Sequence, residues 1–222
     1  MRARLSHQRR RWLGRAWGGE GGWEGGGSVA KGGARTRAEI PVPTPRQAVS
    51  KLLELLNVER EYVPALVCLS QGYLMLKQAP KARNHLKRVA KMPFVAELVD
   101  DFERGWLILA DLYIGGGKYD LAEELCRRCL GANKSCAKAW EFLGYVKEKE
   151  MSYKDAASHY ESAWRLATER EASLGYKLSF NYLKAKRYVD AIDVCHKVLE
   201  HFPDYKGIRK DVLEKARQAL RG

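Results

Sequence analysis

The chain has 222 residues, of which 45% are hydrophobic and 30% charged, and its formal net charge is +13 at pH 7. This composition is typical of a globular protein, and because no apolar run reaches about 18 residues, we expect no membrane-spanning helix. Residues 1–46 carry ten Lys and Arg against three Glu, so the rest of the chain is only mildly basic and we expect no nucleic-acid partner.

Residues 1–45 are predicted to be a disordered, basic, Gly/Arg-rich leader that ends in a Pro-rich stretch. Ten of the 20 glycines precede Arg46, and Gly-rich chain loses too much backbone entropy to order without a core. The first 17 residues, "MRARLSHQRRRWLGRAW", contain no acid. These residues are compatible with three interpretations: a solvated leader from an alternative start, a mitochondrial presequence or an RNA-binding arm. A presequence forms an amphipathic helix, and the apolar face of this stretch is interrupted, so the solvated leader is favoured.

A spacing pattern recurs through the remainder. Four alanines, Ala82, Ala122, Ala156 and Ala191, are separated by 40, 34 and 35 residues. A Leu lies thirteen positions before each of these alanines, and a small residue lies twelve positions before. The residue sixteen positions before is Leu66, Trp106, Trp140 or Gly175. A period near 34 is that of the tetratricopeptide repeat, in which each unit is a pair of antiparallel helices. We therefore predict an all-α tetratricopeptide-repeat superhelix of about four and a half helical hairpins.

The predicted elements follow in chain order. Ala48 lies 34 residues before Ala82, so the array is expected to begin with a second helix alone, as if cut from a longer solenoid. An insertion around "PFVAELVDDFE" should lengthen the first helix of the second full unit or the junction before it. The solenoid of residues 46–222 then divides into a half repeat at 46–61, repeats at about 63–96, 103–136, 137–170 and 172–205, and a capping helix at 206–221.

The capping helix is predicted from one apolar face opposite Lys and Arg. Its members are Ile208, Val212, Ala216, Ala219 and Leu220.

The small residue of each motif has a physical role. A small side chain in the first helix, as at Gly144, lets the two helix backbones approach closely. The alanine in the second helix, as at Ala156, lies where a larger group would push the pair apart. One hairpin cannot cover its own apolar face, so neighbours are expected to stack.

The chain offers few patterns for catalysis or metal binding. Cys126 and Cys129 form a C-x-x-C with Cys136 nearby, but a structural zinc site usually needs a second such pair. Both cysteines also fall on packing positions of the repeat, so we interpret them as core residues. "GGGK" at 115–118 lacks the following Ser or Thr of a phosphate-binding loop. We therefore expect no catalytic residue, metal, cofactor or small-molecule substrate, and the odd count of five cysteines favours a reducing, cytoplasmic setting.

A protein-binding groove is the remaining hypothesis. The first helices should line the concave face of the array, where peptides bind. The charged clamp that captures a C-terminal carboxylate in chaperone-binding repeats is missing, which argues against a chaperone adaptor. The face is apolar and aromatic, so it suits an amphipathic helix or another stretch of solenoid. Packing only within the array is the alternative. The predicted groove residues are Val67, Gln71, Leu74, Leu107, Asp111, Ile114, Glu141, Tyr145, Tyr176, Phe180 and Leu183.

From residue 47 onward the sequence resembles the C-terminal repeats of the tetratricopeptide repeat protein 21 family. The likeness is most specific in "YKLSFNYLKAKRYVDAIDVCHKVLE", which matches beyond the general repeat positions. The resemblance implies a non-enzymatic scaffold in intraflagellar transport complex A, with the protein subunits of that complex as partners and a location in the cilium. It also implies a role in retrograde ciliary transport and ciliary protein trafficking. Family members are far longer, so a truncated or alternative-start product is expected.

Two alternatives to the scaffold stay open at this point. One is a free peptide-binding adaptor with an apolar groove. The other is a short isoform that does not assemble into the complex.

Overall fold

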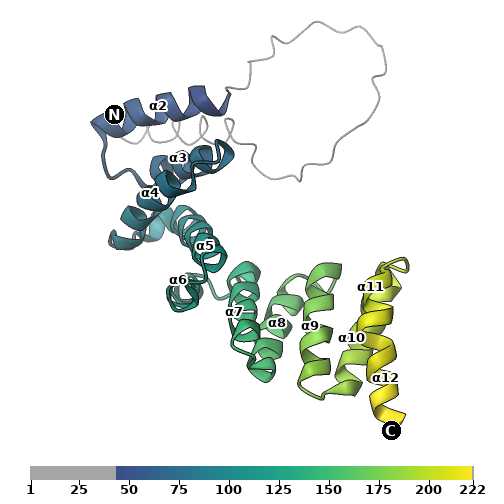
Figure 1. The fold of residues 1–222 in the computed structure, drawn as a ribbon. Helices are drawn as coiled ribbons and strands as arrows, with labels where there is room; N and C mark the ends of the chain where they lie inside the picture. The colour runs from purple at the N-terminus through teal and green to yellow at the C-terminus, as the bar shows by residue number, and fades with distance from the viewer. Residues whose placement is uncertain (1–43, 222) are drawn as a thin grey trace, which may run out of the picture. The chain divides into compact units, whose positions relative to one another are not determined.

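The computed structural model describes residues 44–221, and within that range the chain is helical with no strand. Figure 1 shows the succession of helices, which divides into two compact units, one ending at Pro93 and one beginning at Phe94. The predicted all-α tetratricopeptide-repeat fold is thus confirmed. Most of the predicted leader, residues 1–43, lies outside the described residues. Among the helices that are described, none is both long and apolar enough to cross a membrane.

The first unit contains three helices, α2 (Pro45–Val58), α3 (Val63–Met75) and α4 (Ala79–Lys91). Helix α2 begins at a capping box, in which the Thr44 hydroxyl accepts from the Gln47 amide and the Gln47 side chain accepts from the Thr44 amide. Pro45 at the first helical position suits that start, because its missing N–H would have had no helical partner. Helix α2 packs on α3.

The second unit contains three hairpins and a terminal helical run. The hairpins are α5 (Val99–Gly115) with α6 (Tyr119–Ala132), α7 (Ala137–Lys149) with α8 (Tyr153–Leu166), and α9 (Ala172–Lys184) with α10 (Tyr188–His201). A short 3₁₀ helix, Ala96–Leu98, leads into α5, which has 17 residues. The insertion predicted around "PFVAELVDDFE" therefore lies partly in the segment before α5 and partly in α5 itself, which is longer than the other first helices.

Each hairpin turn uses one residue in the left-handed backbone region. The φ angles are 58° at Lys77, 68° at Gly117, 60° at Met151 and 64° at Lys186. In each case the next amide donates to a carbonyl five residues earlier, as in Ser152 N–H to Lys147 O at 2.9 Å. This is the hydrogen-bond pattern of a Schellman motif, which satisfies the free carbonyls at a helix end. The "GGGK" stretch is therefore such a turn.

Close helix packing at the small positions is explicit in the hairpin of α7 and α8. A Cβ added at Gly144 would lie 2.8 Å from the Tyr160 ring, and Tyr160 and Ala156 are both fully buried. Only a hydrogen fits between α7 and that ring, which is the role predicted for the small residue.

The C-terminal run consists of α11 (Lys206–Ile208), a π-helical turn (Arg209–Leu213) and α12 (Glu214–Arg221). Ile208, Val212 and Ala216 are fully buried against the core of the last hairpins. The predicted apolar face is wrong at Ala219 and Leu220, which are exposed. Ala216 is the last buried residue, so the apolar seam ends one turn before the helix does.

Candidate protein-binding surface

The predicted groove residues all lie on first helices of the hairpins. Those of the first unit are on α3, and those of the second unit are on α5, α7 and α9. The two sets belong to separate compact units. On α5, Asp111 is exposed, whereas Leu107 and Ile114 are partly buried.

Val67 does not fit the predicted surface. Its side chain has no accessible area, because α3 is buried along most of its length, from Val63 to Ser70. A helix covered on both sides by α2 and α4 has little face left for a ligand. Gln71 and Leu74, nearer the end of α3, are partly buried.

Aromatic side chains gather on α7, α9 and the loop before α11 in the second unit. We call Tyr145, Tyr176, Phe180 and Tyr205 the aromatic surface. All four are partly buried and pack against the core of the last two hairpins, as does Leu183. The rings of Tyr176 and Phe180 are stacked with centroids 6.3 Å apart, and Tyr205 meets Tyr176 edge-on at 6.2 Å. Tyr205 was not predicted, because it lies in a loop where helical spacing gives no direction.

Lysine side chains border this aromatic surface. The Lys149 ammonium lies 5.0 Å from the centroid of the Tyr145 ring, and the Lys184 ammonium lies 5.4 Å from that of Phe180. Cations at these distances are attracted to the ring faces. The surface therefore offers flat apolar rings with a positive edge, which suits a partner that carries both apolar and acidic groups.

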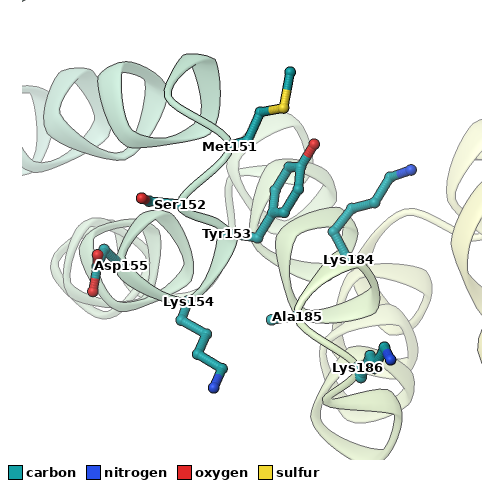
Figure 2. Close-up of a pocket in the computed structure, with 8 residues that line it drawn as sticks. All are labelled: Met151, Ser152, Tyr153, Lys154, Asp155, Lys184, Ala185 and Lys186. Carbon is teal, nitrogen blue, oxygen red and sulfur yellow. The ribbon is translucent and has the colours of Figure 1, made fainter.

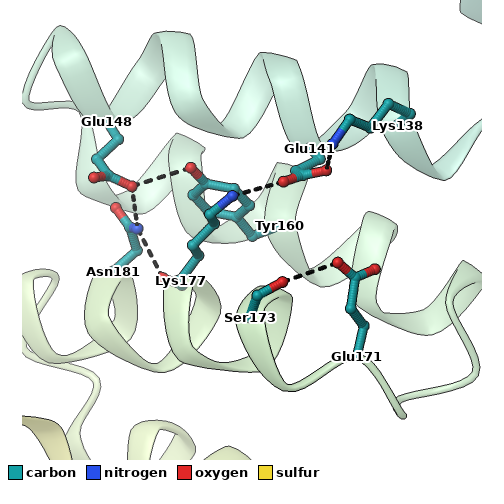
Figure 3. Close-up of polar contacts among 8 residues, drawn as sticks. All are labelled: Lys138, Glu141, Glu148, Tyr160, Glu171, Ser173, Lys177 and Asn181. Carbon is teal, nitrogen blue, oxygen red and sulfur yellow. Dashed lines mark hydrogen bonds and ion pairs between the residues drawn. The ribbon is translucent and has the colours of Figure 1, made fainter. Parts of the chain in front are cut away.

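Glu141 turns out to be a bridge between neighbouring repeats. Figure 3 shows its carboxylate between Lys138 of the same helix and Lys177 of α9, at 2.7 Å and 2.6 Å. Burial raises the pKa of Glu141, but the hydrogen bonds and charges of the two ammonium groups outweigh burial and hold that pKa below its ordinary value. The side chain is 10% exposed. Glu141 thus holds α7 against α9, and little of it is accessible to a partner.

A second polar bridge joins the same helices nearby. The Glu148 carboxylate accepts from the Tyr160 hydroxyl at 3.1 Å and from Nδ2 of Asn181 at 2.9 Å. Asn181 is fully buried, and Nδ2 also donates to the Lys177 carbonyl. Buried polar groups need such partners, because an unpaired one costs free energy. The bridge therefore fixes how α9 lies along α7.

A shallow hollow of about 450 Å³ lies at the turns of the last two hairpins (Figure 2). It is lined by the Met151–Asp155 segment and by Lys184–Lys186. Lys154, Lys184 and Lys186 make the lining cationic, with Asp155 as its carboxylate. No nucleophile paired with a base lines this hollow, so its chemistry is that of a charged surface.

Two histidines, His85 on α4 and His159 on α8, take part in aromatic stacks. His85 stacks on Tyr73 and His159 on Trp140, each with centroids 5.6 Å apart. Burial lowers the pKa of both imidazoles. Neutral stacked rings at these positions contribute to packing.

Comparison with known proteins agrees with the helical-repeat geometry. Residues 42–217 match the family model described as the tetratricopeptide repeat protein 21 C-terminal ARM domain. The chain is 55% identical over 175 residues to mouse tetratricopeptide repeat protein 21B, and 51% identical over 187 residues to mouse tetratricopeptide repeat protein 21A. These alignments cover 79% and 84% of this chain, but only 13% and 14% of the relatives. A Caenorhabditis elegans tetratricopeptide repeat protein 21 homolog is 40% identical over 74% of this chain and 13% of its own length.

Solved structures share the fold at low sequence identity. The crystal structure of MamA superposes with a TM-score of 0.61 at 19% identity, covering 72% of this chain and 89% of MamA. YrrB, described as a tetratricopeptide-repeat protein with an unusual peptide-binding site, gives a TM-score of 0.58 at 14% identity, covering 80% and 84%. At these identities the likeness concerns the fold alone.

Proposed function

The chain belongs to the tetratricopeptide repeat protein 21 family, and on that premise we propose that it is a non-enzymatic protein-interaction scaffold of intraflagellar transport complex A. It acts in retrograde ciliary transport and ciliary protein trafficking, in the cytoplasm and the cilium. Its partners are protein subunits of that complex. The chain spans about an eighth of the length of its curated relatives, and the role proposed is that of this C-terminal part.

The aromatic surface on α7 and α9 is the observation that supports the proposal most directly. Tyr145, Tyr176 and Phe180 are held in place by the core behind them yet remain partly accessible. Rigid aromatic rings supply large contact area at low entropic cost and are enriched among residues that dominate binding energy. An amphipathic helix with acidic flanks fits these rings and their lysine border.

Affinity purification tests the proposal. The tagged full chain is expressed in ciliated cells, and the recovered proteins are quantified by mass spectrometry. Phe180→Ala and Tyr145→Ala should each reduce recovery of transport subunits, since losing a central aromatic anchor costs on the order of 2 kcal/mol, or about 30-fold in affinity. Val189→Ala is the control, because Val189 lies on α10 and is 60% exposed.

Thermal melts of the same variants separate lost binding from lost folding. The proposal predicts that wild-type protein and Val189→Ala recover the transport subunits equally. If the wild-type chain recovers none of them, the scaffold role is wrong. A free peptide-binding adaptor is the second candidate, supported by the same aromatic surface, and it predicts micromolar binding of a single isolated helix that depends on Phe180.

A further inference from the structure

Two thiols and one carboxylate converge at the junction of α5, α6 and α7. The side-chain oxygen of Glu103 and the Sγ atoms of Cys129 and Cys136 all lie within 4.8 Å of one another. Cys129 is fully buried, Cys136 is 5% exposed and Glu103 is partly buried. The aromatic surface uses none of the three.

The chain reversal between α6 and α7 brings the two thiols together. Cys129 occupies the last turn of α6, and Cys136 is the residue that precedes α7 at its N-cap. Asn133 stabilises this loop, since its Oδ1 accepts from the Ser135 amide at 3.0 Å. Its Nδ2 donates to a carboxylate oxygen of Glu103 at 2.8 Å. One asparagine thus positions both the loop and the carboxylate.

Two amide groups lie directly behind the candidate ligands. The Ala139 backbone amide, in the first turn of α7, donates a hydrogen bond to Cys136, and the Asn133 side-chain amide donates to Glu103. Thiolate is the form of cysteine that binds metals. The Asn133 amide and the Ala139 amide would support the ligands from behind, as outer partners do in metal sites.

We propose that Glu103, Cys129 and Cys136 bind one divalent zinc-like cation, with water as the fourth ligand. Thiolate ligands favour zinc over calcium or magnesium, which take oxygen ligands. Zinc bonds of about 2.0–2.3 Å place tetrahedral ligands roughly 3.5–3.8 Å apart. Because the three ligand atoms lie within 4.8 Å of one another, each pair needs to move closer by at most about 1 Å. Three protein ligands and an open position match the ligand count of zinc sites that keep a water.

Cys126 is not part of this group of ligand atoms. The C-x-x-C motif therefore is not the ligand pair, and the proposed pair is the more widely spaced Cys129 and Cys136. Burial raises the pKa of the Cys126 thiol to about 12. A protonated thiol at a packing position agrees with the core role expected for it.

The test measures zinc binding by the full chain, purified metal-free under reducing conditions, through competition with a chromophoric chelator. We expect one zinc ion per chain with submicromolar affinity, and we expect cobalt to give the near-ultraviolet charge-transfer absorbance of a thiolate complex. Cys129→Val should weaken zinc binding on the order of 100-fold or more. Valine already occupies the same repeat position at Val89 and Val198, so this change preserves the packing.

Two further variants and a control complete the design. Cys136→Ser keeps an N-cap residue for α7 but replaces the thiolate, and Glu103→Gln keeps the shape of the side chain without its charge; both should weaken zinc binding. Cys195→Ser removes a buried thiol from α10 and should leave zinc affinity unchanged. Circular dichroism of the metal-free variants checks that each one folds.

Zinc should also raise the melting temperature of the wild-type chain and of Cys195→Ser, but not that of Cys129→Val. The proposal is wrong if the wild-type chain binds no zinc at about 10 µM. It is equally wrong if folded Cys129→Val and Cys136→Ser bind zinc as tightly as wild type.

Discussion

Gly175 provides a quantitative test of how the last two hairpins pack. It lies on α9, where an added Cβ would be 2.4 Å from Cγ2 of Val198 and 2.8 Å from Cη2 of Trp164. Val198 and Trp164 are 1% and 2% exposed, so neither side chain has free space to move into. Carbon atoms pack best at about 3.5–4.0 Å, and the overlap on substitution by alanine therefore exceeds 1 Å.

The cost of Gly175→Ala follows from two opposing terms. Overpacking a filled core costs about 1–3 kcal/mol, whereas alanine gains up to about 1 kcal/mol over glycine in helix propensity. Gly131, on α6, supplies the matched control, because a Cβ there meets nothing within 4 Å. Both variants gain helix propensity, so their difference in unfolding free energy isolates a clash of about 1–3 kcal/mol.

Thermal and urea unfolding, followed by circular dichroism, measure this difference. A loss of 1 kcal/mol lowers the melting temperature by about 2–4 °C for a chain of this size, so Gly175→Ala should melt about 2–12 °C below Gly131→Ala. Equal melting temperatures, or a more stable Gly175→Ala, would refute the packing of α9 against α8 and α10.

Three other substitutions test the hairpin of α7 and α8 and its neighbour. Ala156→Leu should destabilise the fold by about 1–3 kcal/mol through overpacking, and an unchanged melt would contradict the predicted position of that alanine between the helices. Tyr160→Phe removes the hydroxyl donor to Glu148 and should cost about 1 kcal/mol, which a urea midpoint equal to that of wild type would disprove. Glu141→Gln should cost about 1 kcal/mol at pH 7. Since the pKa of Glu141 is lowered in the folded state, its carboxylate stabilises the fold above the unfolded value of 4.5 and stops doing so as pH falls through the folded pKa. The wild-type advantage over Glu141→Gln should therefore vanish in acid, and a pH-independent difference would rule out the ion pair as its cause.

The hairpins were predictable because their signal is local in sequence. The positions of Gly144 and Ala156 repeat in each unit, and the structure places both at the helix contact that their size allows. Helical periodicity indicates which residues share one face of a helix, and this is enough to predict how the two helices of one hairpin pack together.

The binding surface was less predictable, because it depends on how successive units rotate against each other. Val67 has the spacing of a surface residue but is buried, since α3 is covered by both of its neighbours. Glu141 meets a lysine 36 residues away, and no periodicity within one unit indicates that partner. Tyr205 and Cys136 lie in loops or at a helix cap, where the side-chain direction is set by the chain reversal.

The polar bridges between α7 and α9 have a consequence for local unfolding. The Glu141–Lys177 and Glu148–Asn181 contacts cross from one repeat to the next. If either helix unfolds locally, the charged and amide groups of the other helix lose their partners. Repeat arrays open unit by unit when neighbours are weakly coupled. Here the last two hairpins should open together as one foldon, with amide hydrogen exchange in both helices governed by a shared opening free energy.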